Sequence, residues 1–354
     1  MTSDVSDLAP DATTNRDGSR QIGMRDVARL AGVSVATVSR ALSEPTRVSP
    51  AMRGRVETAV RELGYIRDGA ARALSMRRSH AIGAIIPTVD NATRAGKIAA
   101  LQKRCRERGY NLLLALSEYD LSIEVQQCRN LLEAGIDGLM LEGALHDPDL
   151  YALIRKRGVP LVNTAVYDPH AAFPTIGFDN RGAARRLTDH LLDLGHRDIG
   201  MIAGPTAGND RATARVAGVR EAMAARGLSL PDRRIVERPY RVVEGRQGLR
   251  ALIASEPDIT AVICGNDVLA GGALIEAQAM GRTVPRDLSV AGFDDLDWAA
   301  QIPPGLTTMA FPSREIGELA ADYLIDTLGG KTVPHAIEVE VKLILRGSTG
   351  PVAA

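Results

Sequence analysis

The chain has 354 residues, and its 43 Lys and Arg residues balance 43 Asp and Glu residues, so its formal net charge is zero. This length predicts two or three domains, and a hydrophobic content of 45% is enough to bury a sizeable core. No apolar run approaches the roughly 18–20 residues that a membrane-spanning helix needs, so we expect no membrane partner. Taken alone, the zero net charge argues weakly against a nucleic-acid partner.

The N-terminal residues and the cysteines indicate the cellular compartment in which the protein works. Residues 1–20 are rich in Asp, Ser and Thr and contain no apolar stretch, which predicts a disordered tail rather than a secretory signal. Cys105, Cys128 and Cys264 are too few and too scattered for a disulfide framework or a zinc site. This usage is typical of the reducing cytoplasm.

The charge is distributed unevenly along the chain. Residues 20–78 contain 12 Lys or Arg and 5 Asp or Glu, a net charge of +7, whereas residues 1–19 carry −3 and residues 79–354 carry −4. A compact basic segment beside a mildly acidic one is typical of a nucleic-acid-binding head on a body with another function. An arginine-rich, solvated helix surface is the alternative that charge alone leaves open.

Three short helices are predicted in the basic segment. Residues 24–31 place Val27, Leu30 and Ala31 at helical spacing, and residues 35–42 form a second helix after the turn Gly32-Val33-Ser34. Gly32 can adopt positive φ and Ser34 can cap the second helix. A third helix should follow the cap Ser49 and end at Gly64. Two short helices about such a turn are typical of a helix-turn-helix, whose second helix enters the major groove of DNA.

Five short motifs run through this segment. They are Asp26-Val-Ala, Ala31-Gly-Val-Ser34, Thr37-Val-Ser-Arg40, Val48-Ser49 and Glu62-Leu-Gly-Tyr65. Together they closely resemble the lactose-repressor (LacI/GalR) family of bacterial transcription regulators.

The resemblance implies which residues contact DNA. Val35 and Ala36 occupy the exposed start of the recognition helix, where small apolar side chains can touch a thymine methyl, and Arg40 is suited to bidentate contact with guanine. Short hydroxyl side chains are suited to phosphates, and the segment offers Ser34, Thr37 and Ser39. A plain helix cap for Ser34 and helix packing for Thr37 are the alternatives.

In this family a hinge segment becomes helical on operator DNA and inserts a leucine into the minor groove. Here that segment is 68–74, so the resemblance makes Leu74 the wedge. Relatives usually have Pro-Asn before the hinge helix, whereas this chain has Arg67-Asp68. Asp68 can still cap the helix, Arg67 adds a phosphate partner, and the missing proline leaves the hinge less preset in the free protein.

Strands and helices are predicted to alternate after residue 79, with strands at 80–87, 110–116 and 138–141 and helices at about 95–108 and 123–134. Continuous apolar strands between amphipathic helices favour a parallel sheet covered on both faces. The pattern then repeats, since residues 199–205 echo 82–87 and Arg226-Gly227 echoes Arg108-Gly109. Two similar α/β lobes with a ligand cleft between them are therefore predicted.

The family resemblance implies the same architecture: an all-α helix-turn-helix head and an α/β body with a bilobed, periplasmic-binding-protein-like fold of two parallel-sheet lobes. We expect a tail at 1–20, the DNA-binding head at 21–66, a hinge and linker at 67–79, and an effector-binding and dimerisation domain at 80–354. Lobe one should comprise about 80–178 and 310–340, and lobe two about 179–309 and 341–352. The chain should cross between them near 177–180, 304–310 and 338–342.

Family-like motifs also mark the cleft. Arg215 in the stretch 211–218, Asn266 in Gly-Asn-Asp and Asp294 in Gly-Phe-Asp-Asp match positions that hold ligand hydroxyls in relatives. A guanidinium, an amide and a carboxylate can together recognise a polyol or a sugar acid. A structural salt bridge between Arg215 and an acid is the alternative.

Departures from the family pattern bear on the ligand. Asn91-Ala-Thr-Arg94 stands where relatives often have Asn-Pro-Phe-Phe, and Asn163-Thr-Ala-Val-Tyr167 replaces a strand-end Asp-Arg. Two lost ring contacts in a chain with 3% aromatics predict a polar or charged effector. Arg94 is suited either to an anionic group or to solvent. Trp298 follows Asp294 by four residues and belongs either to the core or to the cleft mouth.

The predicted function is a ligand-responsive, sequence-specific transcription regulator, most simply a repressor that binds a palindromic operator as a homodimer in the cytoplasm, associated with the nucleoid. A sugar-modifying enzyme is one alternative, but we find no nucleophile elbow, phosphate-binding loop or metal-spaced cluster, and we expect no cofactor and no metal. A transport solute-binding protein is the other, but it would need a signal peptide and would not need the basic head.

Overall fold

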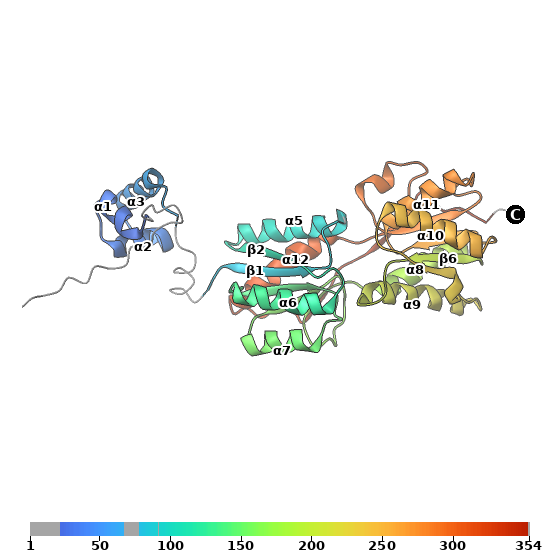
Figure 1. Ribbon diagram of the computed structural model, residues 1–354, viewed down its shortest axis with the longest axis horizontal. Coiled ribbons are helices and arrows are strands. Elements are labelled where there is room, and N and C mark those ends of the chain that lie inside the picture. Colours follow the sequence, from blue (N-terminus) through green and yellow to red (C-terminus); the bar gives the residue numbers. More distant parts are fainter. Residues whose placement is uncertain (1–21, 67–77, 91, 353–354) are drawn as a thin grey trace, which may run out of the picture. The chain divides into compact units, whose positions relative to one another are not determined.

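In the computed structural model, residues 22–66, 78–90 and 92–352 are described and fall into two compact units that divide after Ser79 (Figure 1). The expected tail at 1–20 and the hinge with Arg67, Asp68 and Leu74 lie outside the described residues. The two units are taken separately below.

The first unit is a three-helix head, built from α1 (Met24–Ala31), α2 (Val35–Ser43) and α3 (Pro50–Leu63), with a 3-10 turn at Pro45–Arg47. Gly32 and Gly64 end α1 and α3 with φ near 60°, and the Ser34 hydroxyl accepts a hydrogen bond from the Thr37 amide over 3.1 Å. This arrangement confirms the predicted helix-turn-helix. One inward position was wrong: Leu30 is 50% exposed, and Ala28 packs inside in its place beside Val27.

The second unit begins with a six-stranded, fully parallel sheet that forms lobe one. Its strand order is β11-β5-β4-β3-β1-β2. The strands are β1 (Ala81–Ile86), β2 (Asn111–Leu116), β3 (Gly138–Glu142), β4 (Leu161–Thr164), β5 (Thr175–Gly177) and β11 (Ala336–Glu338). Helices α5 (Ala92–Glu107) and α12 (Ser313–Leu328) cover one face, and α6 (Leu121–Glu133) and α7 (Pro148–Arg157) cover the other (Figure 1). Strands β1 and β3 are buried throughout, as expected for a sheet covered on both faces.

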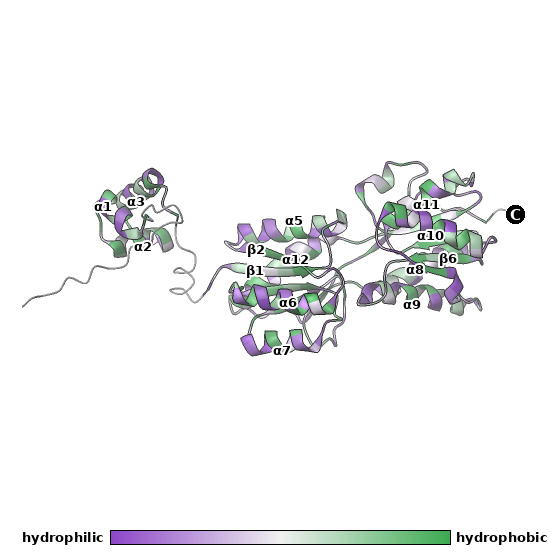
Figure 2. Ribbon diagram, in the orientation of Figure 1, coloured by the Kyte–Doolittle hydropathy of each residue, from purple (hydrophilic) through white to green (hydrophobic). Residues whose placement is uncertain are grey.

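Lobe two repeats this plan with the strand order β12-β10-β9-β8-β6-β7, in which only the pairing of β12 with β10 is antiparallel. The strands are β6 (Ile199–Ala203), β7 (Ile235–Glu237), β8 (Ala261–Cys264), β9 (Ser289–Asp294), β10 (Thr307–Ala310) and β12 (Lys342–Ile344). The helices are α8 (Asn180–Asp193), α9 (Asp210–Ala225), α10 (Val242–Ser255) and α11 (Asp267–Ala279), with 3-10 turns at Asp232–Arg234 and Asp297–Ala300. Figure 2 shows hydrophobic strands inside both lobes and hydrophilic residues on the outer helix faces.

The chain crosses between the lobes three times, after β5, after β10 and between β11 and β12. The second crossing lies at 311–312, slightly later than the expected 304–310, because β10 still pairs with β9 of lobe two. Phe178 and Phe311 stand in the first two crossings with ring centroids 5.2 Å apart. Aromatic packing therefore joins the connections between the lobes.

Glycines allow the helices of each layer to approach closely. A β-carbon at Gly218 of α9 would overlap the main-chain oxygen of Arg181 in α8, and one at Gly317 of α12 would overlap that of Lys97 in α5. The glycine that ends the 211–218 motif therefore serves helix packing.

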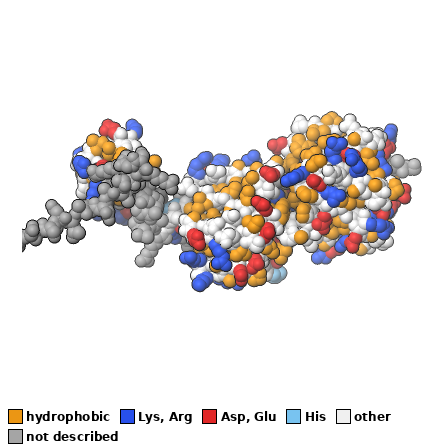
Figure 3. All heavy atoms as spheres, in the orientation of Figure 1, with side chains coloured by type: hydrophobic (Ala, Val, Ile, Leu, Met, Phe, Trp, Pro, Cys, Tyr) orange, Lys and Arg blue, Asp and Glu red, His pale blue; other side chains and the backbone are white. Residues whose placement is uncertain are grey.

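The surface of the body carries both signs of charge. Figure 3 shows basic and acidic side chains interspersed over its visible face, in keeping with its small net charge. Among the described helices, none is long and apolar enough to span a membrane.

Candidate operator and effector sites

The start of α2 presents the residues predicted to contact DNA. Val35, Ala36 and Arg40 are exposed, and within the described head Arg40 has no ion-pair partner, so its guanidinium is available. Ser34 acts as the helix cap, and its hydroxyl also lies 2.9 Å from that of Thr37. Ser39 is half-buried. The surface therefore offers one long cationic donor beside small apolar and hydroxyl groups.

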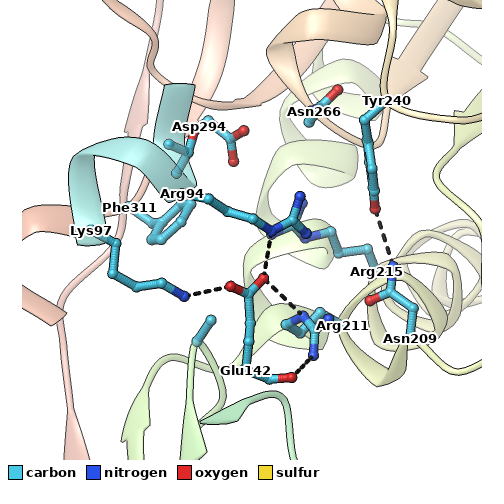
Figure 4. Close-up of a pocket in the computed structure, with 12 residues that line it drawn as sticks. Arg94, Lys97, Glu142, Asn209, Arg211, Arg215, Tyr240, Asn266, Asp294 and Phe311 are labelled. Atoms are coloured by element: carbon cyan, nitrogen blue, oxygen red, sulfur yellow. Dashed lines mark hydrogen bonds and ion pairs between the residues drawn. The ribbon is translucent and has the colours of Figure 1, made fainter. Parts of the chain in front are cut away.

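A cavity of about 50 Å³ lies between the two lobes of the body (Figure 4). Helix α5 and the carboxyl end of β3 supply its lobe-one wall, while α9, the start of α11 and the end of β9 supply its lobe-two wall. It is lined by Thr93, Arg94, Lys97, Glu142, Ala165, Asn209, Arg211, Arg215, Tyr240, Asn266, Asp294 and Phe311. The carboxyl ends of parallel strands are where ligands bind in open α/β sheets.

Glu142, the last residue of β3, is buried among cations. Its carboxylate accepts hydrogen bonds from Arg94 Nε over 2.8 Å and from Lys97 Nζ over 2.6 Å. Burial would raise the pKa of Glu142, but Arg94, Lys97 and Arg211 hold it well below its usual range. Glu142 is therefore a fixed negative charge at the floor of the cavity.

Arg94 lies in the first turn of α5, which begins three residues earlier than the predicted helix. Its guanidinium stands over the rings of Tyr119 and Tyr240, at 5.5 and 5.7 Å from their centroids. Burial opposes the charge, but Glu142 and the two tyrosines outweigh burial and raise the pKa of Arg94. Its Nη1 is buried and has no hydrogen-bond partner among the described residues.

Arg215 extends from α9 into the same cavity. Its Nε donates to Asn180 Oδ1 over 3.0 Å, its Nη1 donates to the main-chain oxygen of Gly265 over 2.6 Å, and its guanidinium lies 4.3 Å from the centroid of Phe293. Within the described chain it forms no salt bridge, which was the structural alternative for this residue. Burial lowers the pKa of Arg215, and the nearby Asp294 opposes that effect.

Asp294 and Asn266 complete the lobe-two wall. Asp294 ends β9 with φ at 119°, and burial raises the pKa of its carboxyl, although Arg215 opposes the increase. Asn266 caps α11, since its Oδ1 accepts from the Leu269 amide over 2.9 Å. Its Nδ2 is buried and has no hydrogen-bond partner in the described part of the chain.

The first turn of α9 ties the lobes together. Asp210 Oδ2 accepts a hydrogen bond from the Ala144 amide of lobe one over 2.7 Å. Arg211 Nη1 donates to Asp210 Oδ1 over 2.7 Å and also reaches lobe one. The lobes are therefore closed on the cavity.

Four of the five predicted effector residues meet in this cavity: Arg94, Arg215, Asn266 and Asp294. Trp298 does not line it, because its indole packs against Gly271 of α11 and the hydrophobic cluster of lobe two. Sequence reasoning missed the lining residues Lys97, Glu142, Asn209, Arg211 and Tyr240. Glu142 had a usable signal, since it is the polar residue that directly follows the predicted apolar strand at 138–141.

Two parts of the chain, one in the head and one in the body, match known protein families. Residues 23–68 match the model of the bacterial regulatory proteins of the lacI family, and residues 188–349 match a periplasmic binding protein-like domain. The transcriptional repressor CytR of Escherichia coli strain K12 is 33% identical over 327 residues, covering 92% of this chain and 96% of the relative. The transcriptional repressor PurR of Salmonella paratyphi A is 32% identical over 328 residues, with the same coverage.

A solved structure of similar shape is the lac repressor dimer bound to operator and the anti-inducer ONPF. It superimposes with a TM-score of 0.84 at 27% identity, covering 94% of this chain and all of that one. The chain belongs to the LacI family of bacterial regulatory proteins and is a ligand-responsive, DNA-binding transcription regulator.

Proposed function

We propose that the protein is a homodimeric repressor that binds a palindromic operator and changes its operator affinity when a small polar effector enters the interlobe cavity. One observation carries the proposal: Arg94 from one lobe meets Arg215, Asn266 and Asp294 from the other in a single buried cavity. A ligand held by both lobes changes how they close, and closure is what can be transmitted to a DNA-binding head.

The contacts that close the lobes support a mechanism in which the lobes move. Asp210 and Arg211 of lobe two bind lobe one beside the cavity, so an effector would enter as these contacts open. The free energy that couples the two sites should be about 1–3 kcal/mol, as is usual for allosteric proteins.

On the DNA side, Val35, Ala36 and Arg40 read base edges, while Ser34, Thr37 and Ser39 contact phosphates. Leu74, outside the described residues, is the proposed minor-groove wedge. A homodimer places two α2 helices in half-sites about one helical turn apart. The dimeric, operator-bound state of the similar lac repressor structure supports this arrangement, and the work of the protein would then be done in the cytoplasm, at the nucleoid.

The relatives CytR and PurR are repressors, which supports a role without an enzymatic step.

Selection of bound sequences from a random DNA pool, with the full chain, tests the proposal. We expect a palindromic consensus, and sedimentation of the complex should give two protomers for each duplex. A non-palindromic consensus or one protomer per duplex would contradict the dimer, and binding without sequence preference would contradict the regulator.

A further inference from the structure

The charges around the cavity do not balance. Its lining has four cations, Arg94, Lys97, Arg211 and Arg215, and two carboxylates, Glu142 and Asp294. Asp210 adds a third negative charge through its pairing with Arg211. Asp267, behind Asp294, adds none while it is protonated, because burial and the neighbouring Asp294 hold the pKa of its carboxyl well above the usual range. Four cationic side chains thus stand against three carboxylates. An uncompensated buried charge is costly, and burial accordingly lowers the pKa of Lys97 although Glu142 lies beside it.

Two buried donors in the same cavity have no acceptor among the described residues. Arg94 is 9% exposed and Asn266 is 3% exposed, and neither Arg94 Nη1 nor Asn266 Nδ2 has a hydrogen-bond partner in that part of the chain. They come from different lobes, and Figure 4 shows the Arg94 guanidinium in the middle of the cavity with Asn266 and Asp294 on the lobe-two side. Buried polar groups are nearly always hydrogen-bonded in folded proteins, so an orphaned pair in a cavity calls for an acceptor.

We propose that the effector is a small polyhydroxylated anion whose anionic oxygens accept hydrogen bonds from Arg94 Nη1 and Asn266 Nδ2. This inference rests on the proposed function, since it assigns a chemical class to the effector of the same cavity. A carboxylate or a phosphate supplies both the missing negative charge and the missing acceptors, whereas a neutral sugar supplies only acceptors. Asp294 and Tyr240 then remain for the hydroxyl groups of the ligand.

The first test measures anion binding by thermal unfolding of the full chain. Sodium acetate and sodium phosphate, each compared with sodium chloride at equal ionic strength, represent the carboxylate and the phosphate. Arg94→Gln removes the donor, and Arg106→Gln is the matched control, because Arg106 is an exposed residue of the same helix with no partner among the described side chains.

We expect the native protein and Arg106→Gln to gain stability with one of these anions in a concentration-dependent manner. Arg94→Gln should bind that anion about tenfold more weakly or worse, because it loses a charge-assisted hydrogen bond. Stabilisation by acetate would indicate a carboxylate effector, and stabilisation by phosphate would indicate a phosphate effector. Equal midpoints in all salts, or equal gains in Arg94→Gln, would overturn the inference.

A second variant does not depend on the Arg94–Glu142 pair. Asn266→Asp keeps an oxygen to cap α11 at Leu269 and replaces the orphaned amide with a negative oxygen. The introduced carboxylate should supply the missing charge, so the midpoint in chloride should rise and the gain with added anion should disappear. Asn209→Asp is the matched control: it lines the same cavity and caps α9, but its Nδ2 already donates to the main-chain oxygen of Pro205 over 2.9 Å, so its midpoint should fall. A lower midpoint for Asn266→Asp, or a retained anion response, would refute the proposed site.

Operator binding by the same samples separates this inference from the proposed function. Neutral and anionic polyols, such as sorbitol and gluconate, are then compared as ligands that change operator affinity. If the native protein binds its operator and responds only to neutral compounds, the anion inference fails and the regulator stands. If the native protein selects no operator, the proposed function fails.

Discussion

Arg211 of lobe two donates a hydrogen bond from its Nη1 to the main-chain oxygen of Glu142 in lobe one, over 2.9 Å. The residue after Glu142 is Gly143, with φ at 95°, and a β-carbon there would overlap the Arg211 guanidinium. The turn after β3 is thus shaped to receive a side chain from the other lobe. Arg211 therefore both stabilises the negative charge of Glu142 at the cavity floor and helps to hold the two lobes closed.

Replacing Arg211 by Ala should lower the free energy of unfolding by about 3 kcal/mol, since it removes one partner from a buried ionic cluster. Arg220→Ala on the same helix is the control, because the Arg220–Asp232 pair is exposed and such pairs contribute under about 1 kcal/mol. Urea unfolding followed by the fluorescence of Trp298, the only tryptophan, measures both. Losses of equal size would argue against the interlobe contact.

The pH dependence of stability should carry the signature of Asp267. Its carboxyl accepts hydrogen bonds from Thr308 Oγ1 over 2.6 Å and from the Leu296 amide over 2.8 Å, and burial followed by the repulsion of Asp294 raises its pKa. Above about pH 4 the unfolded chain has lost this proton while the folded chain keeps it. Its stabilising contribution is therefore largest at low pH and is lost as the pH rises toward the folded-state pKa.

Asp267→Asn removes this titration and can keep both hydrogen bonds. Relative to the variant, the native protein should lose up to about 1.4 kcal/mol for each unit of rising pH within that window. Urea unfolding of both proteins at several values between about pH 5 and 8 gives the difference. Parallel curves would mean that Asp267 is ionised in the folded protein.

Gly218→Ala should destabilise the body by about 1–3 kcal/mol, because α8 and α9 must separate to admit a methyl group. Gly96→Ala on α5 is the matched control. The nearest atom to a β-carbon at that position is Ser313 Oγ at 3.7 Å, so alanine should fit and add about 0.5–1 kcal/mol. Calorimetric midpoints would compare the two, and a neutral Gly218→Ala would refute the close helix approach.

Arg40→Ala should reduce discrimination between the operator and a sequence altered in one base pair by about 1–3 kcal/mol, the contribution of one bidentate base contact. Effector binding should stay unchanged. Arg61→Ala, an exposed arginine of α3, is the control and should leave discrimination intact, because any phosphate contact weakens all sequences alike. Fluorescence anisotropy with matched duplexes measures both, and intact discrimination in Arg40→Ala would remove it from base recognition.

Local signals were sufficient for the head and for the order of elements in the body. Ser34 and Ser49 cap the helices that they were predicted to cap, and the apolar run at 138–141 lies in the buried strand β3. Leu30 shows the limit of such signals: helical spacing fits two neighbouring stripes of α1, and packing against α3 selects the one that contains Ala28.

The cavity could be predicted only in part. Motif positions yielded Arg215, Asn266 and Asp294, and a departure from the motif yielded Arg94. The partners that set its chemistry are far apart in the chain: Lys97 and Glu142 are separated by 45 residues, and Glu142 and Arg211 by 69. These residues come together only through the strand order and the closure of the lobes. The hydrophobic periodicity of the sequence does not predict either of these.

The threefold crossing of the chain has a consequence for protein synthesis. Lobe one is complete only when α12 and β11 have been made, and lobe two needs β12 and then Ser348, whose hydroxyl donates to the Val290 carbonyl over 2.6 Å. Val352 still contributes a hydrogen bond to Leu194. Each nascent chain should therefore expose a folded DNA-binding head for ten seconds or more, at about 5–20 residues per second, before either effector lobe can close.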